Sequence, residues 1–294
     1  MFFYKFKLIY KIFLILLFTS FKIYSADLII FSYDRPMQLY ALLESIEKYV
    51  KNLTSTSVIY RTTNDTFDSG YKIIKDKFSK IKFYKQDNDA KDFKKLLLQA
   101  TFQDSSSEYF LYGVDDLIVT DFIDINYCIE QLEKEKALGF FLRLGKNITE
   151  NYTIIQNCKQ PVLKKCKEDI FSWKFVDGSG DWGLPASTDM TIYRKFDFKD
   201  FFYNLNYSNP NDFEAFWLSV SDKNKIGLCF EFSKNLNIPL IIVQKEKWHR
   251  NMNLCTTQDL LDLFLNGFKI DITNFEKFRN SAPHVELLPE FVKI

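Results

Sequence analysis

The chain has 294 residues, of which 47% are hydrophobic and 17% aromatic, and its formal net charge is +1. This length suits one large domain or two small ones with a sizeable buried core. The balanced charge, without any block rich in Lys and Arg, lacks the electrostatic footprint of a nucleic-acid-binding protein, so we expect no nucleic-acid partner.

The first segment of the chain is a leader, residues 1–26. Lysines precede the apolar run Ile12–Phe18, and the small residues Ser25 and Ala26 follow it. This order is typical of a secretory signal peptide, and the run is shorter than the roughly 20 residues of a membrane-spanning helix. An uncleaved membrane anchor, or no targeting role at all, stays open. We expect an exported or membrane-anchored protein, in a secretory-pathway lumen or a bacterial envelope, with membrane association through the N-terminus.

After the leader, apolar runs alternate with amphipathic segments. The run 26–33 predicts a strand buried on both faces. Residues 34–50 predict a helix with Asp34 as its N-cap and Pro36 in its first turn. Further strands are predicted at 57–63, 81–86, 108–114 and 138–145, and further helices at 69–78, 89–103 and 121–136. Strands that alternate with helices of this length indicate an α/β fold whose mostly parallel sheet is flanked by helices.

Two adjacent carboxylates, Asp115 and Asp116, directly follow the strand 108–114. Neighbouring aspartates repel each other and cannot be buried without partners, so a solvated corner is the simplest explanation. The carboxyl ends of strands in open α/β sheets are, however, where ligands bind. Hard carboxylate oxygens suit Mg²⁺ or Mn²⁺, which typically link one or two carboxylates to a diphosphate. The segment therefore predicts a cation site at this edge of the sheet.

Glycine-rich phosphate motifs are missing from the first half. No GxGxxG follows the first strand and no GxxxxGK[ST] occurs, so neither a dinucleotide site nor a P-loop is indicated. The five cysteines form no CxxC motif, which argues against a zinc ribbon or a thioredoxin-type site. In an oxidising compartment, Cys158 and Cys166 could close a small disulfide loop, and the odd number leaves at least one free thiol.

Three segments resemble the donor half of the GT-A-fold glycosyltransferases, of the family 2-like type: LIIFSYDRPMQLYALLESI, RTTND and YFLYGVDDLIVTDF. Members of that family open with a strand and an x-Arg-Pro-x-x-Leu helix start, and carry an Asp-x-Asp or Glu-Asp-Asp metal motif downstream. Val114 stands at the first acidic position of that motif. The resemblance makes residues 27–145 the nucleotide-sugar-binding half and leaves 146–294 as the acceptor-side half with C-terminal helices.

The resemblance implies a nucleotide-diphosphate sugar as donor, bound with Mn²⁺ or Mg²⁺ across the carboxyl edge of the sheet. The residues expected near the nucleotide are Tyr33, Asp34, Arg35, Asp65 and Asp115. Asp116 is expected on the metal, as is His249, because neutral imidazole is an acceptable ligand. Simpler roles stay open for four of these residues: a helix cap for Asp34, a solvated side chain for Arg35, a turn position for Asp65 and a plain surface location for His249.

The acceptor side is predicted from the segment 176–195, which is rich in glycine, aromatic and acidic residues. It indicates an extended loop followed by a strand. Trp182 and Asp177 are predicted to bind the acceptor, because an aromatic face stacks on a sugar ring while carboxylates accept hydrogen bonds from its hydroxyl groups. A buried Trp182 that anchors the loop is the alternative.

A helix is predicted at 209–220, with Glu214 in its first turn. In inverting members of the family, an acidic residue that opens such a helix often deprotonates the acceptor hydroxyl, as a general base must. Glu214 is the first candidate for this base and Asp181 the second, and a cap or helix-dipole role for Glu214 stays open. Beyond it, 238–244 predicts a strand, and an amphipathic helix is predicted to end near Gly267.

These features predict a glycosyltransferase of the hexosyltransferase class, which moves a sugar from a metal-bound nucleotide sugar to a hydroxyl of a glycan or another acceptor. The alternative is a secreted, non-catalytic carbohydrate-binding protein with a degenerate GT-A fold, which Val114 in place of an acid favours. A nucleotidyltransferase on a similar sheet would need a glycine-rich loop after the first strand, and FSYDRPM is not one.

Overall fold

The computed structural model describes residues 24–87, 91–151, 156–240 and 255–294. In the first half the elements are β1 (Ala26–Tyr33), α2 (Pro36–Tyr49), β2 (Val50–Lys51), β3 (Ser55–Arg61), α3 (Asp65–Lys77), β4 (Lys82–Lys85), α4 (Phe93–Leu98), η1 (Gln99–Gln103), β5 (Tyr109–Val114), β6 (Leu117–Val119), β7 (Ile123–Asp124), α5 (Ile125–Glu135) and β8 (Gly139–Phe141). In the second half they are β9 (Glu150–Asn151), β10 (Gln156–Asn157), β11 (Lys164–Lys165), β12 (Ile170–Lys174), η2 (Phe175–Asp177), η3 (Gly180–Gly183), β13 (Thr191–Arg194), α6 (Lys195–Asn204), α7 (Pro210–Ser219), β14 (Ile226–Phe230), β15 (Asn235–Asn237), α8 (Thr257–Leu265), β16 (Phe268–Ile270), η4 (Ile272–Phe275) and β17 (Phe291–Lys293).

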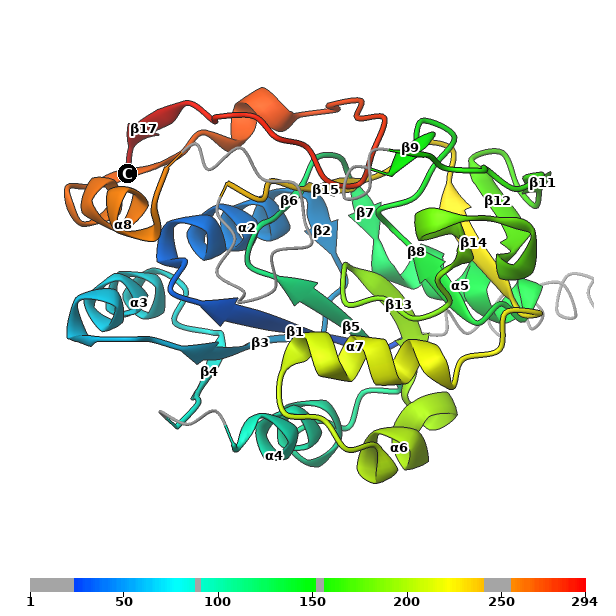
Figure 1. The fold of residues 1–294 in the computed structure, drawn as a ribbon, viewed down its shortest axis with the longest axis horizontal. Helices are drawn as coiled ribbons and strands as arrows, with labels where there is room; N and C mark the ends of the chain where they lie inside the picture. The colour runs from blue at the N-terminus through cyan, green and yellow to red at the C-terminus, as the bar shows by residue number, and fades with distance from the viewer. Residues whose placement is uncertain (1–23, 88–90, 152–155, 241–254) are drawn as a thin grey trace, which may run out of the picture.

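A nine-stranded sheet forms the centre of the molecule, in the order β11-β12-β14-β8-β13-β5-β1-β3-β4 (Figure 1). Within the described sheet, β12 and β13 run against the other strands, so the predicted α/β fold with a mostly parallel sheet is confirmed. The chain moves outward from β1 to β4 and then returns to the other side of β1 with β5. The strand order therefore reverses between β1 and β5, and ligands bind beyond the carboxyl ends of strands at such a point.

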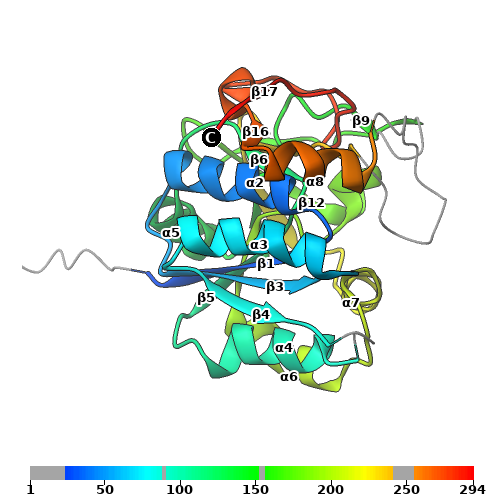
Figure 2. The ribbon, with the colours of Figure 1, turned by 90° about the vertical axis from the view of Figure 1, so that its left-hand side faces the viewer.

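Helices cover both faces of the sheet (Figure 2): α2 and α3 lie on one side, and α4 and α6 lie on the other. The side chains of β1 alternate between the two layers, because successive residues of a strand point to opposite faces. Leu28 and Ile30 belong to the apolar cluster under α2, whereas Ile29 and Phe31 belong to the cluster on the other side. This is why the central residues of β1, from Leu28 to Phe31, are all apolar.

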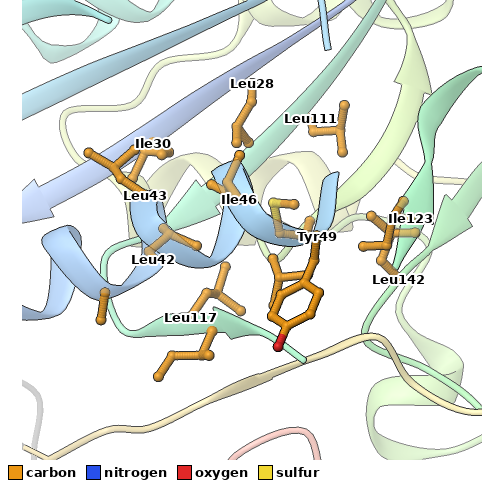
Figure 3. Packing of buried hydrophobic residues seen from close by; sticks show 14 of the residues in the cluster. Leu28, Ile30, Leu42, Leu43, Ile46, Tyr49, Leu111, Leu117, Ile123 and Leu142 are labelled. Carbon is orange, nitrogen blue, oxygen red and sulfur yellow. The ribbon is translucent and has the colours of Figure 1, made fainter. Parts of the chain in front are cut away.

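The helix α2 packs its apolar face on one side of the sheet. Leu43 and Ile46 of α2 lie next to Ile30 and Leu28 of β1 in Figure 3. All of these side chains are buried, which accounts for the apolar stripe that predicted the helix. The turn between β1 and α2 is thereby held at the carboxyl edge of the sheet.

Several helix starts differ from the sequence predictions, among them that of α5 at Ile125, and those of α2 and α3 are explained by single side chains. The residue before α2 is Arg35, whose side chain makes no capping bond, and the predicted cap Asp34 instead accepts a hydrogen bond from the Thr63 amide at 2.9 Å. Asp34 has a φ of 53°, so its own backbone does not lead into a helix. The helix α3 begins earlier than predicted, because the Asn64 side chain caps the amides of Thr66 and Phe67.

Other differences lie in the second half of the chain. The strand predicted at 238–244 is wrong for residues 238–240, which follow β15 without strand structure, and its remainder lies outside the described residues. The strands β12 and β14 and the helix α6 were not predicted. The five cysteines are free thiols, so the Cys158–Cys166 disulfide does not form. Among the described residues, no helix is long and apolar enough to cross a membrane.

Candidate functional site

Arg35 lies between Asp115 and Asp116 at the carboxyl end of β5. Its Nη1 donates to Asp115 Oδ1 at 3.1 Å and to Asp116 Oδ2 at 3.3 Å. The three side chains are 9%, 5% and 11% exposed, respectively. Two adjacent carboxylates are therefore tolerated in a nearly dry position because one guanidinium compensates both. The solvated-corner explanation of this pair is wrong.

Asp115 also ties the end of β5 to the end of β1. Its Oδ2 accepts hydrogen bonds from Ser32 Oγ at 2.9 Å and from the Tyr33 amide at 3.0 Å. Burial raises the pKa of Asp115 to about 6, although Arg35 acts in the opposite direction. Both oxygens of this carboxylate are thus engaged by the chain itself, and its position is fixed without a ligand.

Asp116 also contacts a residue 121 positions later in the chain, Asn237. Its Oδ1 accepts a hydrogen bond from Asn237 Nδ2 at 3.0 Å, and its carbonyl accepts one from the Ile238 amide at 2.8 Å. The same Asn237 Nδ2 lies 3.4 Å from Asp189 Oδ1. Asn237 is buried, and it connects the Arg35 cluster to a second charged cluster.

Arg143 is the centre of that second cluster, two residues beyond β8. Its Nη2 donates to Asp181 Oδ1 at 2.5 Å, and its Nη1 donates to Asp189 Oδ2. Burial disfavours the charged guanidinium, but the two carboxylates more than compensate and raise the pKa of Arg143 above its ordinary value. Because β13 runs against β5 and β8, Asp189 at its start lies at the same edge of the sheet as their carboxyl ends.

Glu214 completes the site from α7. Its Oε1 accepts hydrogen bonds from the Thr188 amide at 2.7 Å and from Thr188 Oγ1 at 3.1 Å. The cap of α7 is Asn209, so the capping role left open for Glu214 is not the observed one. Burial of its carboxylate, reinforced by the negative charge of Asp189, raises the pKa of Glu214 to about 7. A carboxylate with such a pKa is suited to take a proton near neutral pH.

The other donor-side candidates are less tightly joined to the carboxylates. Tyr33 ends β1, and the Arg61 guanidinium lies 4.0 Å from the centre of its ring. Asp34 is buried in the neighbouring turn and holds Thr63. Asp65 is exposed in the first turn of α3 and joins neither cluster. His249 lies outside the described residues.

Trp182 differs from its predicted role. The side chain is fully buried, its Nε1 donates to the Ile148 carbonyl at 3.0 Å, and its ring meets Trp173 edge to face. A side chain without exposed surface has no face to offer a sugar, so the alternative of a loop anchor is the observed one. Asp177 is exposed and stands apart from the Arg143 cluster, which Asp181 joins.

Three site residues were not predicted from the sequence: Arg143, Asp189 and Asn237. Arg143 carried a signal, because it is a charge within the apolar run LGFFLRLG and a buried charge requires a partner. Asp189 stands just before β13, at the start of the segment DMTIYRK, which was predicted as a strand and given no role in the site. Nothing in NLNIPL marked Asn237 as a residue of the site.

The fit of the described residues to a divalent cation rests on Asp116 and on the neighbouring Gln38 amide. They contain no group of three or more His, Cys, Asp and Glu side chains placed to hold a metal ion. Mg²⁺, however, is usually held by one or two carboxylates together with substrate phosphates, and Asp116 offers such a hard oxygen ligand. Gln38 lines a small cavity with Asp115 and Asp116, and its buried amide has no hydrogen-bond partner in the described part of the chain. An unsatisfied buried amide beside two carboxylates fits a bound ion or its water.

One curated protein gives a clear sequence match, whereas no family model matches the chain. The chain is 27% identical over 192 residues to the bifunctional glycosyltransferase pgtA of Dictyostelium discoideum. This match covers 60% of the chain but 24% of pgtA, so the chain spans about a quarter of that relative's length. The resemblance to glycosyltransferases that was drawn from the sequence is thereby confirmed.

Solved structures of similar arrangement include TarS 1–349 of S. aureus in complex with UDP, with 15% identity, a TM-score of 0.45, and coverage of 70% of this chain and 60% of that one. They also include GalNAc-T7 with UDP, GalNAc and Mn²⁺, with 11% identity, a TM-score of 0.49, and coverage of 76% of this chain and 46% of that one.

Proposed function

We propose that this protein is a glycosyltransferase that moves a sugar from a nucleotide-diphosphate sugar to a hydroxyl group of an acceptor. The observation that carries the proposal is the meeting of two arginine–carboxylate clusters at the carboxyl edge of the sheet. One cluster, around Arg35, lies at the point where the strand order reverses. The other, around Arg143, brings a carboxylate of raised pKa to the same edge.

The Arg35 cluster is the proposed donor side. Asp116 would hold Mn²⁺ or Mg²⁺, with His249 as a further proposed ligand, and the ion would supply positive charge to the donor's diphosphate when bound. Arg35 adds a permanent positive charge at the same place, because the neighbouring carboxylates keep it protonated. Asp115 would position both residues, since its own oxygens are used to join β1 to β5.

The Arg143 cluster is the proposed acceptor side, with Glu214 as general base. Glu214 would accept the proton of the acceptor hydroxyl while that oxygen bonds to the anomeric carbon. The bond from this carbon to the diphosphate would break at the same time, and the nucleoside diphosphate would leave with the electron pair. A single displacement of this kind inverts the anomeric centre. Asp181 is the weaker candidate, because its carboxylate is engaged by Arg143.

The location of the enzyme is part of the same proposal. The leader, residues 1–26, has the basic and apolar order of an export signal. We therefore place the reaction in a secretory lumen or at an envelope, with a glycan or another hydroxyl compound as acceptor.

Calorimetry of nucleotide binding tests the donor site. UDP and GDP would be titrated into the full chain with and without Mn²⁺, and into Asp116→Ala. The matched control is Asp104→Ala, which removes an exposed carboxylate at the opposite end of β5. We expect binding that depends on Mn²⁺, is lost in Asp116→Ala and is kept in Asp104→Ala. If the folded wild-type protein binds neither nucleotide, the donor site is contradicted for these bases, and a non-catalytic carbohydrate-binding protein becomes the better proposal.

A further inference from the structure

Asn237 is held rigidly at the centre of the site by its backbone. Its amide donates to the Pro283 carbonyl and its carbonyl accepts from the Val285 amide, both at 2.9 Å. It lies opposite Leu117 in the pairing of β15 with β6, directly after Asp116. The residue is 1% exposed, so its side chain has little freedom to turn away. The fixed backbone of Asn237 beside Asp116 therefore places its side-chain amide between the two clusters.

The side-chain amide of Asn237 serves two carboxylates at once. Carboxylates only accept hydrogen bonds, so the NH₂ group must be the part that faces them. It donates to Asp116 at 3.0 Å and lies 3.4 Å from the Asp189 oxygen. A leucine of similar volume has no donor, and an aspartate would bring a third negative charge. The asparagine side chain therefore offers one N–H hydrogen-bond donor to Asp116 and one to Asp189.

The two carboxylates belong to different sides of the site. Asp116 shares Arg35 with Asp115, whereas Asp189 shares Arg143 with Asp181. Within the described residues, Asn237 is the side chain that hydrogen-bonds a carboxylate of each cluster. The charge of Asp189 in turn acts on Glu214. A change at Asp116 can therefore reach the proposed base through one amide.

We infer that Asn237 is a positioning residue that couples the donor side to the acceptor side, an inference that rests on the proposed function. When the nucleotide-sugar donor and its cation interact with the Asp116 carboxylate, the hydrogen bond that this carboxylate accepts from Asn237 weakens. The amide is then free to bond Asp189 more strongly, which changes how Asp189 shares Arg143. Donor binding and the state of the acceptor side are linked reciprocally, as any two coupled sites must be.

A cycle of four proteins tests this coupling: wild type, Asp189→Asn, Asn237→Leu and the double variant. The affinity for UDP with Mn²⁺ is measured by calorimetry for each. We expect Asp189→Asn to change the affinity at least about threefold in the wild-type background, although Asp189 lies in the other cluster. In the Asn237→Leu background, the same substitution is expected to leave the affinity unchanged. Equal fold-changes in both backgrounds would overturn the inference.

Controls separate this result from a general disturbance of the strand. Asn235 lies on the same strand, is fully buried and has no hydrogen-bond partner for its amide among the described residues. Asn235→Leu is expected to leave the effect of Asp189→Asn intact, and loss of the effect there would also overturn the inference. Where Asn237→Leu does not fold, Asn237→Ala also removes the hydrogen-bond donor without adding a charge, and it takes the place of Asn237→Leu in the cycle.

The proposed function and the coupling fail in different ways. If wild type binds UDP with Mn²⁺ and Asp116→Ala does not, the donor site stands whatever the cycle shows. Additive effects in the cycle then contradict the coupling alone. If no nucleotide binds to the folded wild type, the proposed function fails first, and the inference built on it falls as well.

Discussion

Arg35 and Arg143 explain how this chain keeps several carboxylates close together at one edge. Each guanidinium is shared by two aspartates, and all of these side chains are largely buried. Arginine suits this position because its planar group offers several donors and stays charged when buried. Removal of one partner leaves a buried charge uncompensated, which is far more costly than the loss of an exposed pair.

Replacement of Arg35 by methionine tests the compensation of the two aspartates. Arg35→Met leaves Asp115 and Asp116 beside each other without their shared cation, so we expect a loss of about 3–5 kcal/mol in the free energy of unfolding. Urea denaturation measures this loss. Arg279→Met removes an exposed arginine and is expected to cost less than about 0.5 kcal/mol. Equal losses in the two variants would contradict the buried-pair explanation.

Glu214 is expected to make stability depend on pH. Its pKa is raised from 4.5 to about 7, so the native state favours the protonated form. The stabilisation is fully present below the unfolded pKa and is lost as pH rises through the native pKa, by about 3 kcal/mol in total. Urea unfolding at a series of pH values should show a steeper decline between pH 4.5 and 7 in wild type than in Glu214→Gln, where the raised pKa of Asp115 still contributes below about pH 6.

The same carboxylate should control the reaction rate. A base of raised pKa must be ionised to act, so kcat/KM is expected to rise as pH increases through about 7. Glu214→Gln cannot accept the proton and is expected to lower the rate by about 10²–10⁴-fold. A variant that keeps wild-type activity and pH dependence would show that another group is the base.

At the scale of elements, the site depends on how closely the segment after β8 approaches the segment after β14. Gly145 lies where these backbones meet: a Cβ there would come within 2.4 Å of the Ser233 amide nitrogen and 2.6 Å of the Phe232 carbonyl carbon. Backbone atoms cannot turn aside as a flexible side chain can. The glycine therefore allows the contact that keeps the Arg143 segment in place.

Gly145→Ala is the substitution that tests this close approach. We expect it to cost about 1–3 kcal/mol in the free energy of unfolding, because the two backbones must separate. The matched control is Gly113→Ala in β5, where the added Cβ would make only ordinary contacts of 3.6 Å or more. This control should be neutral or slightly stabilising, since glycine weakens a strand interior. A neutral Gly145→Ala would contradict the close packing of the two segments.

At the scale of the whole molecule, the carboxyl and amino ends of the parallel strands carry different groups of charged residues. The carboxyl edge carries both arginine clusters, whereas the amino edge carries a buried ion pair between Lys195 and Asp27. Lys195 Nζ donates to Asp27 Oδ2 at 2.8 Å and to Ser105 Oγ at 2.7 Å, and both charged residues are buried. This pair joins α6 to the start of β1, far along these strands from the proposed donor site.

Lys195→Met separates stability from binding. Loss of the buried cation is expected to cost about 3–5 kcal/mol in the free energy of unfolding, because Asp27 stays buried. The affinity for UDP with Mn²⁺ should stay the same at a temperature where the variant is folded, since the pair lies at the opposite edge. Urea denaturation and calorimetry on the same preparation check both statements, and a large change in affinity would contradict the division between the edges.

Much of the first half could be predicted because its signals are local. The apolar centre of β1 and the leucine stripe of α2 depend on residues a few positions apart, and most predicted elements there overlap the observed ones. The strand predicted at 138–145 is shorter than expected, because β8 ends at Phe141. Element boundaries were less predictable where a single side chain decides them. The Asn64 side chain caps α3, which therefore begins earlier than predicted. Asp34 does not cap α2, because its backbone has a positive φ.

The sequence by itself determined the α/β class and the place of Asp115 and Asp116 at the end of a buried strand, because periodicity and adjacency depend on consecutive residues. The resemblance to glycosyltransferases also came from the sequence alone, through three segments that are similar to motifs of that family. Only the tertiary structure decided which charges meet. Arg143 and Asp189 are 46 residues apart, and Asn237 reaches Asp116 across 121 residues. Such contacts follow from strand order and from the insertion of β13 between β5 and β8, which no local pattern specifies.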